Sequence, residues 1–265
     1  MKEHKHIVLT GGHSGMGLEL TKMLLKQGHT IGLLLRNEKR KLETMALLGN
    51  STNIHYFFAD LGDRDALAKV SREITNAWPK IDVLFNNAGV LTDKLYRSKR
   101  GNELQLEVNA ISPYLLTEAL YPLLSKSNSP TVVNTATTGL QKKIAFDIEG
   151  FKNPKKFSKL TGSYMDSKLM MVLLMDYLDR LWPDVNIISA DPGAIKTKMT
   201  ASKGMPFWLK PIRKLFFRSP KEGARKLYEA AFSKRDSNSG SYRSKGKAMV
   251  MTLRLKETDI ERLLE

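Results

Sequence analysis

The chain has 265 residues, of which 42% are apolar and 26% charged, so we expect one folded globular domain and exclude a disordered chain. It contains no cysteine, which excludes disulfides, a thiolate nucleophile and a cysteine-based zinc site. The formal net charge is +16, but the cations are spread without interleaved aromatic side chains, so we expect a solvated basic surface and no nucleic-acid partner. The apolar residues 7–9 are too few for a signal peptide or a membrane span, and we expect a cytoplasmic protein.

Short apolar runs alternate with longer segments of helical period along the chain. The predicted strands are residues 7–9, 30–35, 54–58, 83–85, 131–134 and 185–190. The predicted helices are residues 15–27, 64–78, 102–124, 163–181 and 221–232. This alternation predicts an α/β fold, a single-domain, Rossmann-type, doubly wound parallel sheet with helices on both faces. Such a sheet opens a crevice at the carboxyl ends of its strands, where a nucleotide can bind.

A glycine-rich turn, residues 10–17 (TGGHSGMG), joins the first predicted strand to the first helix. Glycine lets a backbone turn sharply and approach a pyrophosphate, and a helix N-terminus supplies N–H donors with a partial positive charge. The turn therefore predicts a dinucleotide-phosphate site, and a tight turn that binds nothing is the alternative. The candidate contacts are Gly11, Ser14, Gly15, Met16 and Gly17.

The residue after the second predicted strand is Arg36, where folds that select NAD usually have an acidic side chain. A guanidinium at this position would bind a 2′-phosphate with two charge-assisted hydrogen bonds, which favours NADP(H) over NAD(H). A surface cation that only caps the strand is the alternative. Asp60 and Leu61 follow the third strand, where the Asp60 carboxylate would accept from the adenine amino group or cap the helix that begins near Asp63.

Several further polar or glycine-containing segments follow predicted strands or lie on the later helices. In chain order they are Asn86-Asn87-Ala88-Gly89, Asn109, the pair Tyr164 and Lys168, and Asp191-Pro192-Gly193 through Thr197. Together with the glycine-rich turn, and in this order over nearly the whole chain, they resemble the short-chain dehydrogenase/reductase family. The resemblance implies an oxidoreductase in which hydride passes between a nicotinamide cofactor and a carbonyl or secondary alcohol.

Tyr164 and Lys168 lie four residues apart, so on a helix they share one face and reach one cavity. A free phenol has a pKa of about 10. The nearby ammonium, aided by the positive charge of an oxidised nicotinamide, favours phenolate and lowers that pKa, which predicts Tyr164 as the general acid and base. The resemblance further implies that Lys168 binds the nicotinamide ribose and that Asn109 holds a water that relays protons.

The family usually has a serine after the fifth strand that donates a hydrogen bond to the substrate oxygen. Alignment on the preceding Val-Asn places Thr137 at this position, and Thr138 is the alternative if the register is one residue off. Threonine keeps the hydroxyl donor and adds a methyl group. The departure keeps a second hypothesis open, a catalytically weak NADP-binding regulatory protein of the same fold.

The remaining site residues are expected from the resemblance alone. Residues of two segments are implied to border the cofactor, the second shaping the nicotinamide pocket: Asn87, Ala88 and Gly89, then Pro192, Gly193, Ile195 and Thr197. The chemistry requires no metal ion, and the sequence has no cluster of histidines that predicts one.

Residues 205–218 place aromatic and aliphatic side chains among cations at roughly helical spacing. We expect residues 198–219 to form an apolar lid over a lipophilic substrate, and contact with a membrane surface or a partner is the alternative. The tail, with a predicted helix over 257–264, loosely resembles that of retinol-dehydrogenase-like members. Family members often pair through the helices that here carry Asn109 and Tyr164, so the resemblance implies a homodimer or homotetramer.

Overall fold

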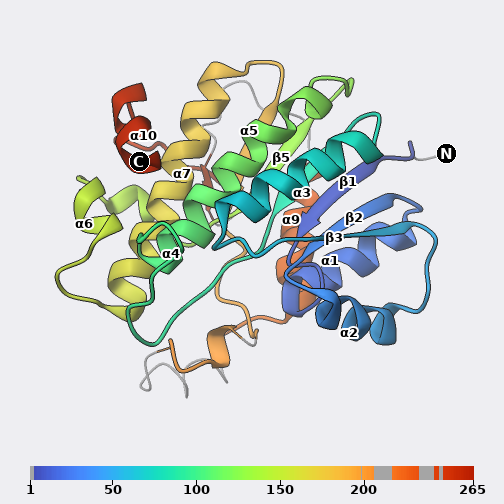
Figure 1. The fold of residues 1–265 in the computed structure, drawn as a ribbon, viewed down its shortest axis with the longest axis horizontal. Helices are drawn as coiled ribbons and strands as arrows, with labels where there is room; N and C mark the ends of the chain where they lie inside the picture. The colour runs from blue at the N-terminus through green and yellow to red at the C-terminus, as the bar shows by residue number, and fades with distance from the viewer. Residues whose placement is uncertain (1–2, 198, 206–216, 233–241, 245–246) are drawn as a thin grey trace.

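One mixed sheet of eight strands forms the centre of the molecule (Figure 1). The structure is a computed structural model, and it describes residues 3–197, 199–205, 217–232, 242–244 and 247–265. The strand order is β3-β2-β1-β4-β5-β6-β7-β8; the first seven are parallel and β8 is antiparallel to β7. The strands are β1 (His6–Thr10), β2 (Thr30–Leu35), β3 (Ile54–Phe58), β4 (Val83–Asn86), β5 (Thr131–Thr135), β6 (Asn186–Ala190), β7 (Tyr242–Ser244) and β8 (Lys247–Ala248). The order reverses direction at β1, which confirms the predicted doubly wound sheet.

Helices cover both faces of the sheet (Figure 1). One face carries α1 (Gly15–Lys26), α2 (Glu38–Leu48) and α9 (Pro220–Phe232), and the other carries α3 (Arg64–Ala77), α5 (Ser112–Leu124) and α7 (Met165–Leu181). Side chains of β1 alternate between the two interfaces, because Ile7 and Leu9 pack under α1 and α9 whereas Val8 packs under α3 and α5. Among the described helices, none has the length and apolar character needed to cross a bilayer.

Among the described α-helices and strands, four lie outside the predicted ones: α2, the short helix α6 (Ile148–Lys152), β7 and β8. Helix α2 shows no apolar periodicity in the sequence, because Thr44 is its only buried side chain among the described residues, and it was therefore not predicted. It is supported locally, since the Asn37 side chain accepts a hydrogen bond from the backbone N–H of Arg40 and Lys41 pairs with Glu38 at 2.7 Å. Strands β7 and β8 are three and two residues long, too short for a periodic pattern to indicate.

The predicted C-terminal helix is present as α10 (Glu257–Leu264) and packs beside α6 (Figure 1). Its apolar side chains Ile260 and Leu263 are buried in the same cluster as those of α7. Lys152 Nζ on α6 donates to the carbonyl oxygen of Arg262 at 2.8 Å. The chain end is therefore fixed against the face of the sheet that α3, α5 and α7 cover.

Gly32 in the middle of β2 makes room for the indole of Trp78, and it provides a test of this packing. A Cβ at Gly32 would lie 2.9 Å from Trp78 Cη2 and 3.0 Å from Phe57 Cε2. We expect Gly32→Ala to lower the free energy of unfolding by about 1–3 kcal/mol, measured by urea denaturation. Leu47→Ala, at an exposed position, is the control, and a Gly32→Ala effect as small as the control's would show that the indole moves aside.

Candidate active site

The turn between β1 and α1 approaches its neighbours so closely that side chains are excluded. Gly11 and Gly15 have φ values of 70° and 54°, in the left-handed region. A Cβ on Gly17 would lie 2.3 Å from the carbonyl oxygen of Gly11, and a Cβ on Gly11 would lie 3.0 Å from Ala88 Cα. The turn therefore has the bare backbone and the adjoining helix N-terminus that suit a phosphate group.

The two other residues predicted in this turn have different surroundings. Ser14 is the N-cap of α1, in extended conformation, and its side chain makes no capping hydrogen bond. Met16 is buried, and a Cβ on Gly223 of α9 would meet its sulfur at 2.6 Å, so Met16 joins α1 to α9. Of this pair, Ser14 is the residue whose hydroxyl belongs to the turn, whereas the Met16 side chain packs against a helix.

A threonine hydroxyl joins the glycine-rich turn to the end of β4. Thr10 Oγ1 accepts from the backbone N–H groups of Asn87 and Ala88 at 3.0 and 2.9 Å, and Asn87 Nδ2 donates to the Thr10 carbonyl oxygen at 3.0 Å. Asn86 Nδ2 donates to Asn134 Oδ1 at 2.9 Å and so extends the connection to β5. The Asn87 side chain thus stabilises the start of the glycine-rich turn through its hydrogen bond to Thr10.

The predicted adenine end of the crevice carries an exposed ion pair. Arg36 Nε lies 3.4 Å from Asp60 Oδ2, and the two side chains are 57% and 48% exposed. Asp60 Oδ1 accepts from the backbone N–H of Gly62 at 2.9 Å, while Asp63 is the residue that caps α3, so the capping alternative for Asp60 is wrong. Leu61, beside it, accepts a hydrogen bond at its carbonyl from Ser112 Oγ. An exposed pair of this kind contributes little to stability, so the guanidinium can turn toward an anion at small cost.

Asn109 lies in a π-helical turn where a continuous helix was expected. The predicted helix 102–124 divides into α4 (Leu104–Leu106), the π turn η1 (Glu107–Ile111) and α5. The wider turn directs the Asn109 amide to the loop after β4, where Oδ1 accepts from Val90 N at 2.8 Å and Nδ2 donates to Val90 O at 3.0 Å. Nδ2 also donates to Ser167 Oγ on α7 at 3.0 Å. Asn109 therefore links the β4 loop to α7, and such π turns occur often at functional sites.

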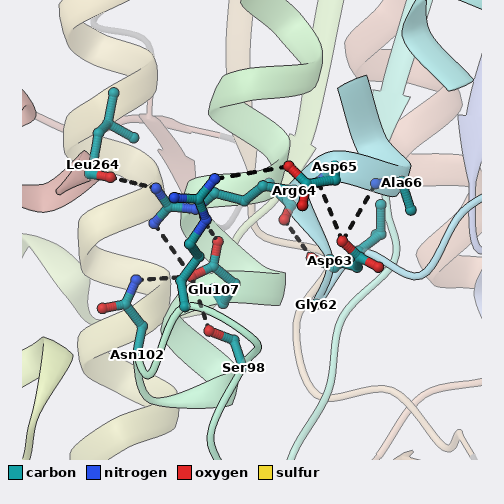
Figure 2. Close-up of polar contacts among 12 residues, drawn as sticks. Gly62, Asp63, Arg64, Asp65, Ala66, Ser98, Asn102, Glu107 and Leu264 are labelled. Atoms are coloured by element: carbon teal, nitrogen blue, oxygen red, sulfur yellow. Dashed lines mark hydrogen bonds and ion pairs between the residues drawn. The ribbon is translucent and has the colours of Figure 1, made fainter. Parts of the chain in front are cut away.

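The first residue of η1, Glu107, has a fully buried carboxylate that Arg64 of α3 holds (Figure 2). Arg64 Nε lies 2.6 Å from Glu107 Oε1, and Arg64 Nη2 donates to Oε2 at 3.3 Å. Asn102 Nδ2 and Ser98 Oγ also donate to Oε2, at 2.8 and 3.3 Å. Arg64 Nη1 donates to the carbonyl oxygen of Leu264 at the end of α10. One guanidinium therefore joins α3, the turn that carries Asn109, and the C-terminal helix.

Tyr164 and Lys168 lie where α7 begins. Tyr164 ends a second π turn, η3 (Lys159–Tyr164), and only 8% of its surface is exposed. Lys168 is buried and its Nζ donates to the carbonyl oxygen of Thr135 at the end of β5, at 2.7 Å. A Cβ on Gly89 would lie 3.7 Å from that Nζ and 3.1 Å from Asn109 Oδ1. The fold thus brings Gly89, Asn109 and Lys168 together, and Tyr164, one helical turn before Lys168, packs in an apolar cluster with Leu91 of the same loop as Gly89.

Burial controls the ionisation of this pair. It raises the pKa of Tyr164 to about 12, with a further contribution from the Asp191 carboxylate. It lowers the pKa of Lys168 to about 8. The tyrosine shift is opposite to the one expected from the nearby ammonium, because the low-polarity surroundings disfavour the phenolate and the ammonium is bonded to a carbonyl. Tyr164 is therefore a phenol, a proton donor, at neutral pH.

The two candidate threonines after β5 differ in what their groups contact. Thr138 Oγ1 donates to Asp191 Oδ2 at 2.7 Å, so this hydroxyl serves the protein. The carbonyl oxygen of Thr137 accepts from Tyr242 Oη at 2.7 Å, a bond that holds its backbone in place. Of the two, Thr138 therefore has its hydroxyl bonded to a protein side chain, the Asp191 carboxylate after β6.

Residues 191–197 border the crevice opposite the glycine-rich turn. Gly193 has a φ of 86° and follows Pro192, whose carbonyl oxygen accepts from Lys226 Nζ at 3.0 Å. Ile195 is buried and pairs by an isolated bridge with the chain at 218. A Cβ on Gly15 would lie 3.4 Å from the Thr197 methyl carbon, so this segment lies close to the glycine-rich turn.

A small apolar cluster covers Tyr164. Leu91 and Met205 are buried with it, and three partly buried side chains pack against them: Leu160, Met199 and Phe217. The cluster includes both described flanks of the predicted lid. Lys198 and residues 206–216, the middle of that lid, lie outside the described residues.

The comparisons with known proteins agree with this arrangement. The sequence model of the family "short chain dehydrogenase" matches residues 5–148. A short-chain dehydrogenase/reductase from Armillaria gallica is 30% identical over 205 residues, which cover 74% of this chain and 66% of that protein. Retinol dehydrogenase 11 from Mus musculus is 28% identical over 247 residues, which cover 90% of this chain and 77% of that protein.

Among solved structures, NADPH-bound carbonyl reductase from chicken fatty liver superposes with a TM-score of 0.72 at 19% identity, over 93% of this chain and 99% of that one. At that identity the likeness concerns the fold. The fold and the family match together define an α/β oxidoreductase. The chain belongs to the short-chain dehydrogenase family.

The Arg64 network provides a test of how firmly the Asn109 turn is held. Arg64→Met would leave the Glu107 carboxylate buried without its cation, so we expect the free energy of unfolding to fall by about 3–5 kcal/mol in urea denaturation. The matched control is Arg225→Met, which removes an exposed arginine paired with Glu229 at 3.7 Å and should cost less than about 1 kcal/mol. Equal effects of the two substitutions would contradict the role given to Arg64.

Proposed function

We propose that the protein is an NADP(H)-dependent oxidoreductase that transfers hydride between the cofactor and a carbonyl or secondary alcohol, with Tyr164 transferring the proton. The observation that carries the proposal is the meeting of Lys168 and Asn109 beside Gly89 at the carboxyl ends of β4 and β5, with Tyr164 joined to Asn109 through Ser167, which accepts from the Asn109 amide and donates to the Tyr164 carbonyl oxygen. The glycine-rich turn lies next to the same loop. Chance alone does not explain this combination in a fold that binds nucleotides at those strand ends.

The residues present fit a dinucleotide. A side chain at Gly11 or Gly17 would clash with neighbouring backbone, so the turn leaves room for a pyrophosphate at the helix N-terminus. We assign the nicotinamide ribose to Lys168 and the 2′-phosphate to Arg36, whose guanidinium forms only an exposed ion pair. When bound, the nicotinamide supplies or accepts the hydride.

In the direction of reduction, the protein's own groups act on the carbonyl oxygen. Tyr164 donates its phenolic proton to that oxygen as the carbon accepts hydride, so one C–H and one O–H bond form and the carbonyl becomes an alcohol. A pKa of about 12 keeps this proton in place at neutral pH. Thr137 donates a hydrogen bond to the same oxygen, and Lys168 and Asn109 connect the tyrosine to its proton supply.

The substrate is proposed to be lipophilic. Leu91 and Met205, with their partly buried neighbours, surround the Tyr164 side chain with apolar surface. The similarity to retinol dehydrogenase 11 and to a polyprenol dehydrogenase from Danio rerio, 26% identical over 259 residues, agrees with such a substrate. The lid role of residues 198–219, a homodimer or homotetramer, membrane contact and a cytoplasmic location stay predictions.

A catalytically weak NADP-binding regulatory protein remains the second hypothesis, and the observation in its favour is the threonine at the serine position. Engagement of the Thr138 hydroxyl by Asp191 supports Thr137 as the group that contacts substrate. The second hypothesis requires tight cofactor binding without turnover.

The first test is Tyr164→Phe, which removes the proton donor and keeps the ring. We expect carbonyl reduction to fall at least about 100-fold, because general acid catalysis typically contributes that much, whereas NADPH affinity stays within about threefold. Turnover is followed by the absorbance of reduced nicotinamide with all-trans-retinal, decanal and benzaldehyde, and affinity by calorimetry. Tyr228→Phe on α9 is the control. NADPH binding with no turnover by the wild-type protein would favour the regulatory hypothesis.

Cofactor choice is tested at Arg36. We expect Arg36→Leu to weaken NADPH binding by about 10- to 100-fold, the worth of a charge-assisted hydrogen bond or two, and to leave NADH binding within about threefold. Asp60→Asn is the matched control, since it frees the guanidinium from its ion pair and should bind NADPH at least as tightly as the wild type. If Arg36→Leu weakened both cofactors equally, Arg36 would not be the 2′-phosphate ligand.

A further inference from the structure

We propose that Asp191 is a positioning residue of the reaction: its buried carboxylate holds the loop that carries Thr137 against the Pro192–Gly193 turn and supplies a negative charge that acts on the site. The inference rests on the proposed function. It assigns a role to a residue that neither the cofactor nor the substrate oxygen is expected to touch.

The hydrogen bonds of the Asp191 carboxylate connect separate segments of the chain. Asp191 follows β6 and is 6% exposed. Its Oδ2 accepts from Thr138 Oγ1 and from Ser244 Oγ, both at 2.7 Å, and its Oδ1 accepts from the backbone N–H of Gly193 at 2.7 Å. One side chain therefore joins three segments that are far apart in sequence: the loop after β5, the turn after β6 and strand β7.

Strand β7 holds the same loop a second time. Tyr242 and Ser244 are alternate residues of β7, so their side chains lie on one face, and both are buried. Tyr242 Oη donates to the carbonyl oxygen of Thr137 at 2.7 Å, while Ser244 reaches the loop through Asp191. Thr137 is thus fixed at its own carbonyl by one bond and at its neighbour Thr138 by another, which limits where its hydroxyl can point.

Hydrogen bonding alone does not require a negative charge at Asp191. The donors to Asp191 are two hydroxyls and one amide, and a neutral asparagine would satisfy the same groups, because hydroxyls can donate or accept. Burying a carboxylate costs much more than burying an amide. The cations Lys168 and Lys226, on α7 and α9, bond to the carbonyl oxygens of Thr135 and Pro192. The greater free-energy cost of burying a carboxylate in place of an amide is explained if the negative charge of Asp191 itself has a function.

That use is the protonation state of Tyr164. Burial raises the pKa of this phenol, and the Asp191 charge raises it further. On the described segments around Tyr164, the other titratable side chains include Lys168 and Asp166 on α7, Lys159 on η3, Asp93 after Leu91, Lys203 before Met205, Arg218 beside Phe217, and Tyr242 and Arg243 on β7. Asp191 therefore favours the phenol, which is the form that protonates a carbonyl oxygen, over the phenolate, which is the form that alcohol oxidation needs.

The test is Asp191→Asn, compared with Asp176→Asn, which removes one negative charge from the partly exposed ion pair with Arg180 on the same helix as Lys168. Removing the Asp191 charge lowers the cost of forming phenolate, so we expect the rising limb of the pH profile for alcohol oxidation to move to lower pH by about half a unit to one unit. Asp176→Asn should leave the profile unchanged. Coincident profiles for Asp191→Asn and the wild type would overturn the charge role.

Positioning is tested separately with Tyr242→Phe and Ser244→Ala, which keep the Asp191 charge. We expect kcat for carbonyl reduction to fall about 3- to 30-fold with KM changed less than about twofold and an unmoved pH profile, because each substitution removes one hydrogen bond that orients Thr137. Wild-type kcat in both variants would overturn the positioning role. These two variants also keep the proposal falsifiable if Asp191→Asn fails to fold.

One measurement does not depend on turnover. The ultraviolet difference spectrum of tyrosinate is titrated in each protein, and the titration of the same protein carrying Tyr164→Phe is subtracted to isolate Tyr164. A lower midpoint in Asp191→Asn supports the charge role even if no carbonyl is reduced, an outcome that would refute the proposed function alone. An unchanged midpoint in a protein that does reduce carbonyls would refute the Asp191 charge role alone.

Discussion

The contact on which the site depends is the hydroxyl of Thr10, which fastens the end of β1 to the loop after β4. Parallel strands end at one edge of the sheet, but their following loops diverge unless something joins them. Thr10 accepts two backbone N–H groups from that loop, and Asn87 returns a hydrogen bond to the Thr10 carbonyl. This bond network brings the glycine-rich turn to within contact of Ala88 and leaves Gly89 facing Asn109 and Lys168.

The second constraint is the exclusion of water from the reacting groups. Tyr164 and Lys168 are both buried, and burial moves their pKa values apart, to about 12 and about 8, from ordinary values that are nearly equal. Each shift favours the neutral form, so at neutral pH Tyr164 is an uncharged phenol, whereas Lys168 is still mainly an ammonium, and the ionisation of both groups responds to any charge placed beside them. In the proposed reaction, a cationic cofactor ring would favour the phenolate form of Tyr164, whereas the Asp191 carboxylate favours the phenol. The balance between these two charges decides how readily the tyrosine gives up its proton.

Periodicity and glycine placement predicted most of the fold, because the central parallel strands β1, β2 and β4 are buried on both faces and rich in apolar residues. Each predicted strand and helix is present, and α10 has the predicted bounds. What escaped prediction is local. The helix around Asn109 and the start of the helix at Tyr164 contain π turns, which leave no mark on an apolar period. Strand β7 gains its place from Tyr242 and Ser244, whose partners lie 105 and 53 residues away and could not be inferred from spacing.

Two kinds of buried charge occur in this chain. Glu107 meets the Arg64 guanidinium, so its charge is neutralised where it lies and its effect is to hold the Asn109 turn against α3 and α10. Among the described residues, the Asp191 carboxylate accepts hydrogen bonds from neutral donors, two hydroxyls and a backbone amide, and its charge raises the pKa of Tyr164. A paired charge of the first kind can stabilise geometry alone. A charge of the second kind also sets the ionisation of its neighbours, which is why Asp191 and not Glu107 is the buried carboxylate expected to change the pH dependence of the reaction.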